Sequence, residues 1–95
     1  TGTALEDFGR HVLLTNFAHY LEVFCELTGA TPRGTDRPMP NATAQGITMI
    51  NFGMGSANAA TVMDLLGAIR PKAALFLGKC GGLKRKNNIG DFVLP

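Results

Sequence analysis

The stretch Ile47–Gly78, ITMINFGMGSANAATVMDLLGAIRPKAALFLG, joins two apolar runs through a glycine-rich turn and a segment with helical spacing. The apolar runs, Ile47 to Phe52 and Ala73 to Leu77, are predicted to be strands, and the second is apolar on both faces. Between them, Ala57 to Ile69 places apolar residues on one face of a helix, which we expect to be largely buried. This order is typical of a right-handed βαβ unit in a parallel sheet that is covered on both sides.

Elements on either side of this unit extend the α/β pattern. They are, in chain order, a helical turn over Leu5 to Gly9, a short strand over His11 to Leu14, a helix from Phe17 that stops at Gly29, a short strand over Asn41 to Gln45 that turns at Gly46, and a strand over Asp91 to Leu94. Within the central helix, Gly67 costs about 1 kcal/mol relative to alanine, so its presence predicts close packing at that point.

Composition bounds the class of protein. The 95 residues are 45% hydrophobic, only 17% charged and carry a net charge of +2, which describes one globular unit. A charged fraction this low predicts that much of the surface is covered, either by another part of the protein or by a partner. The sequence stops at Pro95 directly after an apolar run, and we therefore expect the chain to be part of a domain. We see no signal peptide and no stretch long enough to span a bilayer. The two widely spaced cysteines, Cys25 and Cys80, have no metal-ligand spacing and favour a reduced, cytoplasmic setting, with a single disulfide as the alternative.

The loops after the predicted parallel strands carry the candidate chemistry. The turn Asn51 to Ser56 and the loop Gly78 to Gly82 should reach the same carboxyl edge of the sheet, where such sheets bind ligands, and we expect them side by side. Thr15-Asn16 joins them if the strand from His11 belongs to the same sheet. Glycines in the first turn allow a close backbone approach and Ser56 can cap the helix, but both features are as typical of a turn without a ligand.

Two familiar phosphate-binding motifs are absent. A dinucleotide fingerprint lacks its third glycine, because Asn58 stands there, and a P-loop lacks its first glycine and its final serine or threonine. Lys79 has two interpretations: a ligand for a phosphate or carboxylate, or a surface lysine that reaches solvent or pairs with an acid. Cys80 is interpreted as a small packing residue rather than a nucleophile. The run Lys84-Arg85-Lys86 is interpreted as a solvated hairpin tip, with nucleic-acid contact as the alternative.

The chain resembles the purine nucleoside phosphorylase and nucleosidase superfamily in the segments INFGMGSANAATVMDLL, RPKAALFLGKCGGL and IGDFVLP. Two upstream segments, HVLLTNFAHYLEVF and PMPNATAQGI, extend the resemblance to essentially all of the chain. The resemblance implies a three-layer α/β sandwich with a mixed, largely parallel sheet, of which residues 1–95 form the N-terminal portion. The substrate-binding residues that it implies are Asn16, His19, Gly53, Met54, Gly55, Lys79, Cys80 and Gly81.

The resemblance also implies roles for these segments. Met54 matches a methionine that packs on the sugar, the loop Gly78 to Gly82 lines the base and ribose pocket, and Thr15 to Tyr20 matches part of the phosphate site. Phosphorylases carry an arginine at the position of Phe76 and a serine at that of Lys79, both of which bind the phosphate nucleophile. Loss of the arginine favours water as nucleophile and hence a hydrolase.

Within the superfamily, the likeness is to bacterial enzymes that hydrolyse AMP to adenine and ribose 5-phosphate without a cofactor. A phosphate-binding arginine is typical at the position of His19. The acid that protonates the leaving purine and the glutamate that holds the ribose hydroxyls match no position in these 95 residues. We therefore expect no catalytic residue in this chain, and no activity from the chain alone.

Three alternatives stay open. The first is another purine nucleosidase or a nucleoside phosphorylase, the second a non-catalytic nucleotide-binding α/β module, and the third a basic fragment that contacts RNA. The resemblance implies AMP or a related purine nucleotide as ligand and a homo-oligomer as assembly. We expect neither nucleic acid nor membrane as a partner, because the positive net charge is small.

Overall fold

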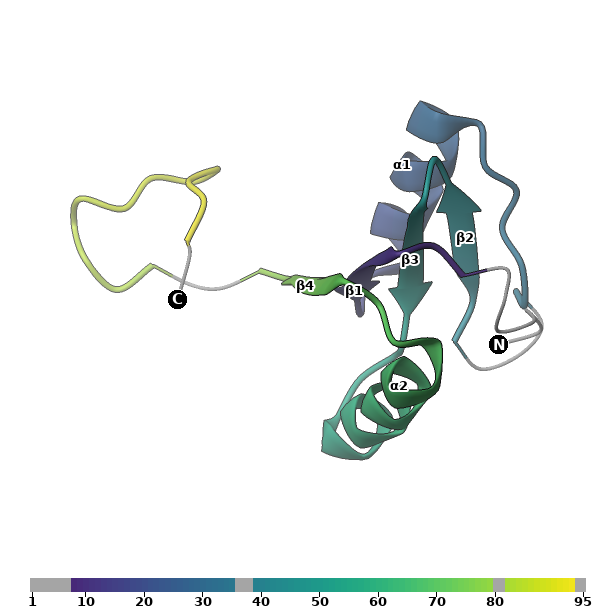
Figure 1. Ribbon diagram of the computed structural model, residues 1–95. Helices are drawn as coiled ribbons and strands as arrows, with labels where there is room; N and C mark the ends of the chain where they lie inside the picture. The colour runs from purple at the N-terminus through teal and green to yellow at the C-terminus, as the bar shows by residue number, and fades with distance from the viewer. Residues whose placement is uncertain (1–7, 36–38, 80–81, 94–95) are drawn as a thin grey trace.

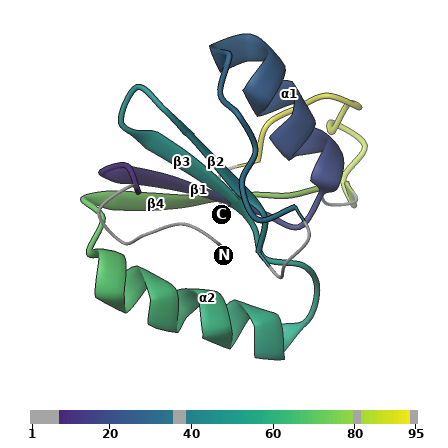
Figure 2. The same cartoon turned by 90° about the vertical axis from the view of Figure 1, so that its right-hand side faces the viewer.

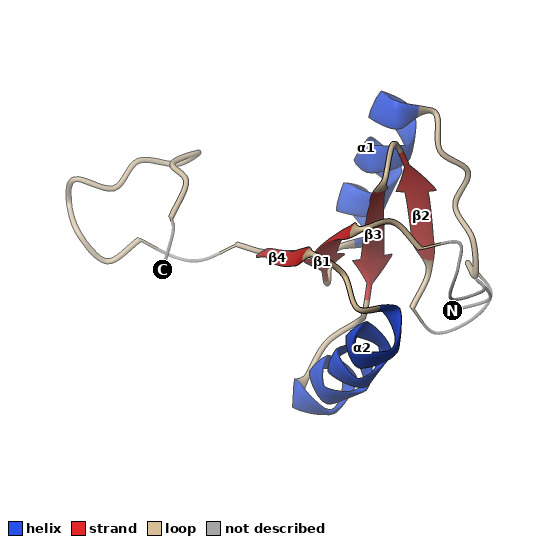
Figure 3. Cartoon of the chain, viewed as in Figure 1, coloured by secondary structure: helices blue, strands red, loops and turns tan. Residues whose placement is uncertain are grey.

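The computed structural model describes residues 8–35, 39–79 and 82–93, in which strands and helices follow each other along the chain (Figures 1 and 3). The elements are, in order, β1 (His11–Thr15), α1 (Ala18–Thr28), β2 (Asn41–Ala44), β3 (Ile47–Asn51), α2 (Ser56–Ile69) and β4 (Ala73–Leu77). These elements confirm the predicted strands and helices of residues 11–77, with ends that differ by one residue.

The strands form one mixed sheet in the order β2-β3-β1-β4. β1 is parallel to both β3 and β4, whereas β2 is antiparallel to β3. α1 lies on one face of the sheet and α2 on the other (Figures 1 and 2), so that helix, sheet and helix form three layers. The mixed, largely parallel α/β sheet predicted from the sequence is confirmed.

The register brings the carboxyl ends of the three parallel strands level. Thr15, the last residue of β1, pairs with Asn51 of β3 on one side and with Leu77 of β4 on the other. Because β1 lies between β3 and β4, the loops after those two strands flank the loop after β1. The expectation that the two loops sit side by side is therefore wrong, since an apolar pattern identifies strands but not their order in a sheet.

Alternate residues of the strands supply an apolar cluster on each face of the sheet, as expected when side chains point to opposite faces in turn. The buried cluster on the α2 face consists of Val12, Leu14, Ile50 and Val62. The buried cluster on the α1 face consists of Leu21, Phe24, Ala42 and Met49. Each helix is thus held to the sheet by a stripe of apolar side chains, each of which contributes about 1.5–3 kcal/mol when fully buried.

A tight hairpin joins β2 to β3 and supports the start of the described chain. Gln45 and Gly46 both have positive φ angles, 53° and 77°, as in the turns that match the twist of antiparallel strands. Gly9 lies against this hairpin, and its N–H donates a hydrogen bond of 2.6 Å to Thr48 Oγ1. The Thr48 hydroxyl is itself 2.7 Å from Thr43 Oγ1. The hairpin therefore pairs the hydroxyl groups of Thr43 and Thr48 with each other and also provides an acceptor for the Gly9 N–H.

The helix ends agree with the sequence except at one cap. Gly29 ends α1 with φ 75°, and its N–H donates to the carbonyl oxygen of Cys25. At the start of α2, the N-cap is Gly55 and no side chain caps the helix, so the predicted cap by Ser56 is wrong. Gly55 has φ 92° and ψ 160°, a conformation that glycine adopts readily, and this places Ser56 already within the first turn.

Two predicted elements near the ends of the chain are wrong or undescribed. Asp91 to Val93 form no strand; instead Asp91 closes a local turn, in which its N–H donates to Asn88 O and its carboxylate accepts from Asn88 N–H. Leu94 lies outside the described residues. The helical turn over Leu5 to Gly9 falls mostly outside them too, and Phe8 and Gly9 are not helical. Lys84-Arg85-Lys86 occupies an exposed turn without the paired strands of a hairpin.

The expected burial of α2 and β4 is also wrong within the described residues. In α2 only Val62 is buried, and a Cβ added at Gly67 would meet nothing within 4 Å, so no close packing explains that glycine. β4 lies at one edge of the sheet, where Leu75 and Phe76 are about half exposed. The apolar pattern shows which residues favour burial, but the described part of the chain places no further element over the exposed sides of α2 and β4.

Candidate functional site

The turn from β3 into α2 is held by two asparagine side chains. Asn51 Oδ1 accepts a hydrogen bond of 3.2 Å from Gly53 N–H, and Asn58 Nδ2 donates one of 2.9 Å to Met54 O. Gly53 has φ 79°, a conformation that favours glycine, and a Cβ there would lie 2.9 Å from Asn58 Nδ2 and displace that amide. Met54 lies on this turn and is 76% exposed, so its side chain is available for an apolar contact with a ligand.

The end of β1 contributes a polar atom that lacks a partner. Asn16 Oδ1 is buried and, in the part of the chain that the structure describes, accepts no hydrogen bond. Buried side-chain oxygens normally accept a hydrogen bond. An oxygen without one at the carboxyl end of β1 is therefore available to a donor from a ligand. The neighbouring Thr15 is fully buried and its Oγ1 accepts from Phe17 N–H at 3.2 Å.

Lys79 follows β4 and lies against aromatic rings rather than an acid. Its Nζ is 4.8 Å from the centre of the Phe17 ring and 5.6 Å from that of Tyr20. The two rings are 5.2 Å apart and tilted by 52°. Among the described residues Lys79 forms no ion pair. The sequence left open whether Lys79 binds an anion or only reaches solvent or pairs with an acid. The structure adds an aromatic contact that neither interpretation included.

His19 is the candidate that the structure leaves apart from these groups. It lies in the first turn of α1 with an exposed side chain, and its Nδ1 is 3.5 Å from Glu22 Oε2. No contact joins it to Lys79 or to the turn after β3 in the described part of the molecule. Cys80 and Gly81 are outside the described residues.

The register therefore places five of the eight predicted residues just beyond the carboxyl ends of the parallel strands. Asn16 follows the central strand, the group of Gly53, Met54 and Gly55 follows one neighbour, and Lys79 follows the other. Sequence patterns did not indicate that Phe17 and Tyr20 pair beside Lys79, or that Asn51 and Asn58 hold the turn after β3. The resemblance placed the segment Thr15 to Tyr20 in the phosphate site without a role for either ring, although their i, i+3 spacing in the first turn was a usable signal.

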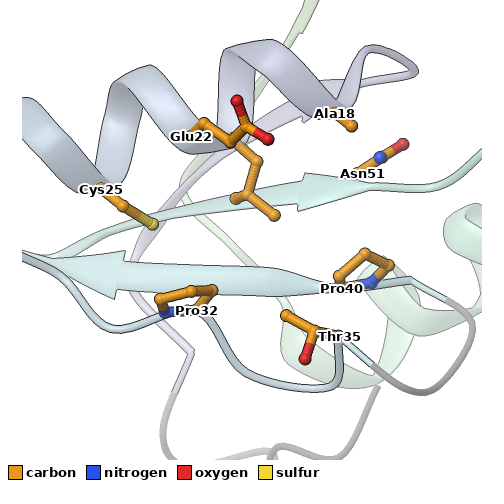
Figure 4. Close-up of a pocket in the computed structure, with 8 residues that line it drawn as sticks. Ala18, Glu22, Cys25, Pro32, Thr35, Pro40 and Asn51 are labelled. Atoms are coloured by element: carbon orange, nitrogen blue, oxygen red, sulfur yellow. The ribbon is translucent and has the colours of Figure 1, made fainter.

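A cavity of about 490 Å³ lies on the α1 side of the sheet, away from most of these residues. Figure 4 shows it between α1 and the segment that carries Pro32, Thr35 and Pro40. Its lining residues are Ala18, Leu21, Glu22, Cys25, Pro32, Thr35, Pro40 and Asn51. A second cavity of about 230 Å³ borders Gly53 and Asn58 and shares Asn51 with the first. The turn after β3 therefore has open space on its flank.

Cys25 lines the larger cavity but lacks the features of a nucleophile. Burial raises the pKa of its thiol, so less of it is thiolate near neutral pH than in an ordinary cysteine. We expect iodoacetamide to alkylate Cys25 more slowly than glutathione at pH 8, and the rate to rise as the pH is raised. Peptide mass spectrometry separates Cys25 from Cys80, and equal rates for Cys25 and glutathione at pH 8 would contradict the raised pKa.

Neither a metal-binding cluster nor a membrane-spanning helix is found among the described residues. No group of three or more histidine, cysteine, aspartate or glutamate side chains is arranged to hold a metal ion in residues 8–35, 39–79 and 82–93. No helix in those ranges is long and apolar enough to cross a membrane.

Comparisons with known proteins agree on one family. A family model described as the phosphorylase superfamily matches residues 10–95. The chain is 31% identical over 131 residues to AMP nucleosidase from Escherichia coli strain K12 and to that from Escherichia coli O157:H7, matches that cover 99% of this chain and 27% of each relative. The crystal structure of AMP nucleosidase from Bacteroides thetaiotaomicron VPI-5482 is 63% identical, with a TM-score of 0.88, and the match covers 94% of this chain and 39% of that one. The chain thus spans about a quarter of the length of these curated relatives.

Proposed function

Because the chain belongs to the phosphorylase superfamily, we propose that it is part of an AMP nucleosidase, which hydrolyses AMP to adenine and ribose 5-phosphate. The observation that carries this proposal is the 63% identity to a solved AMP nucleosidase over nearly the whole chain. Phe76 adds support, because it stands where the resemblance gives the phosphorylases a phosphate-binding arginine. Its ring packs 5.8 Å from that of Phe52, so an apolar contact replaces a cation at that position.

The chain is proposed to be the N-terminal portion of the catalytic domain, with the rest of that domain outside residues 1–95. The matched fractions of the relatives, 27% and 39%, support this division. The resemblance matches none of the acidic residues of this chain to the general acid; among the described ones, Glu22 contacts His19 and Asp91 closes a turn of its own. The acid that protonates the purine is therefore proposed to lie elsewhere in the protein. We also propose that the complete protein is a cytoplasmic homo-oligomer.

The residues at the sheet edge are proposed to bind and orient AMP. Lys79 supplies a positive charge for the 5′-phosphate, Met54 packs on the ribose, and the backbone at Gly53 and Gly55 approaches the sugar closely. Asn16 Oδ1 is suited to accept a hydrogen bond from the nucleotide, because it is otherwise unsatisfied. Cys80 and Gly81 extend the proposed pocket, and His19 lies at its margin in the first turn of α1.

In the proposed reaction the bond between C1′ and the purine N9 breaks as water attacks C1′. The transition state resembles an oxocarbenium ion, and a carboxylic acid with a raised pKa gives its proton to N7 of the leaving adenine. The water oxygen becomes the C1 hydroxyl of ribose 5-phosphate and its proton is released. Fixing the phosphate and ribose at one edge holds C1′ in place for attack, which converts binding contacts into orientation.

Product analysis of the complete enzyme tests this proposal. We expect equal amounts of adenine and ribose 5-phosphate from AMP, at a rate that does not require inorganic phosphate. Formation of a sugar 1-phosphate that depends on added phosphate would instead identify a phosphorylase. Saturable AMP binding without release of adenine would identify the non-catalytic nucleotide-binding module.

A further inference from the structure

Lys79 and two rings of α1 form a contact that none of the sequence motifs indicated. The ammonium nitrogen lies within 6 Å of both ring centres, at 4.8 Å from Phe17 and 5.6 Å from Tyr20. A cation at such a distance from an aromatic face is attracted to the ring quadrupole. The contact joins the loop after β4 to the first turn of α1, across the end of the central strand β1.

The rings are held firmly enough to serve as a fixed support. Phe17 is the N-cap of α1, and its N–H donates to the hydroxyl of fully buried Thr15. Tyr20 N–H donates to Phe17 O at 3.1 Å, and the Tyr20 side chain packs against the apolar cluster on the α1 face. The backbone of both aromatic residues is therefore tied to the carboxyl end of β1, and the Phe17 ring contacts the packed Tyr20 ring, while Lys79 is an exposed side chain on a loop.

An aromatic support differs from an acidic one in what it leaves available. A carboxylate partner would neutralise the ammonium and compete with an incoming anion, whereas a ring restricts the side chain and leaves its charge free. A free lysine loses about 2 kcal/mol of rotamer entropy when a ligand fixes it, so restricting it beforehand lowers that cost. Lys79 makes no ion pair within the described ranges, which leaves its charge for a ligand.

We propose that Phe17 and Tyr20 are positioning residues that hold the Lys79 ammonium at the sheet edge for the phosphate of a nucleoside monophosphate. The inference rests on the proposed function and deepens it, since it assigns part of the preference for a phosphorylated over an unphosphorylated nucleoside to two aromatic side chains. These rings act through Lys79 and need not touch the substrate themselves.

Kinetics of the complete enzyme test the effect on substrate choice. The phosphate preference is measured as the inhibition constant of adenosine divided by the KM for AMP. We expect Phe17→Leu and Tyr20→Leu each to lower this ratio about two- to fivefold, the range of an exposed cation–π contact, through KM rather than kcat. Tyr20→Phe keeps the ring face and should retain the ratio.

A double-mutant cycle separates positioning from a purely structural role. In a Lys79→Met background, Phe17→Leu and Tyr20→Leu should leave the ratio unchanged, because there is no ammonium to hold. If the leucine variants lower the ratio equally with and without Lys79, the inference is overturned.

An NMR measurement without substrate tests the contact itself. Lysines of the complete enzyme are methylated with ¹³C, which keeps their charge, and the Lys79 signal is assigned by its loss in Lys79→Arg. The signal should lie upfield through the ring currents and move back in Phe17→Leu; a signal at the ordinary lysine position in the unsubstituted enzyme would overturn the inference. This readout does not depend on catalysis, so an enzyme that fails to hydrolyse AMP but shows the shift refutes the proposed function and not the contact.

Discussion

Replacing Lys79 with methionine in the complete enzyme is expected to raise the KM for AMP tenfold to a hundredfold. The reason is the loss of a charged hydrogen-bond donor to the 5′-phosphate, a contact worth about 1.5–3 kcal/mol. Methionine keeps most of the apolar stem of the side chain and removes the ammonium that lies over Phe17 and Tyr20. The inhibition constant of adenosine, which lacks the phosphate, should change less than about twofold, a difference too small for a lost charged contact.

Lys72→Met is the matched control for this prediction. Lys72 precedes β4 and Lys79 follows it, so the two lysines stand at opposite ends of one strand. The backbone N–H of Lys72 donates to Arg10 O, a bond that the substitution leaves intact. The control should leave the KM for AMP unchanged. Equal loss of AMP and adenosine affinity in Lys79→Met would exclude a phosphate role for this side chain.

Replacing Gly9 with alanine is expected to lower the free energy of unfolding by about 3 kcal/mol, the upper part of the usual range for overpacking. An added Cβ would collide with the backbone of Gly46 and lie 2.8 Å from Ile47 N. These atoms belong to the hairpin between β2 and β3 and cannot move aside as a flexible side chain would. The shift would also disturb the bond from Gly9 N–H to Thr48 Oγ1. Denaturant unfolding of the complete enzyme measures the change.

Gly67→Ala provides the opposite expectation in the same experiment. Gly67 lies inside α2, where an added Cβ meets open space, so alanine should stabilise the protein by up to about 1 kcal/mol. Equal tolerance of alanine at Gly9 and Gly67 would contradict the contact between Gly9 and the hairpin. A loss of stability in Gly67→Ala would instead restore the expectation of close packing drawn from the sequence.

The sequence predicted the elements of the fold because their signals are local. Periodicity located both helices, and Gly29 and Gly46 marked a helix end and a hairpin turn that the structure confirms. The strand order depends on which strand inserts between two others, and no local pattern carries that information. The strand at Asp91 to Leu94 failed for a related reason: apolar residues form a strand only where a partner takes their backbone hydrogen bonds.

The location of the candidate site could be predicted from the sequence, but the contacts between its side chains could not. Parallel strands implied a shared carboxyl edge, and the register of Thr15 with Asn51 and Leu77 confirms that the three strands end level there. The contact of Lys79 with Phe17 joins residues far apart in sequence, so spacing alone could not reveal it. The family resemblance supplied roles, and the assignment of those roles to individual residues remains a prediction to be tested by substitution.

The central place of β1 in the sheet has a consequence for how the chain acquires its structure. β1 is synthesised before both strands that flank it, β3 and β4. The β2–β3 hairpin closes over a two-residue turn and can form quickly, whereas β1 must wait for partners with a large sequence separation, a topology that slows folding. Until β4 emerges from the ribosome, one edge of β1 carries unpaired backbone groups. During that interval we expect the nascent chain to depend on chaperones to prevent association through this edge.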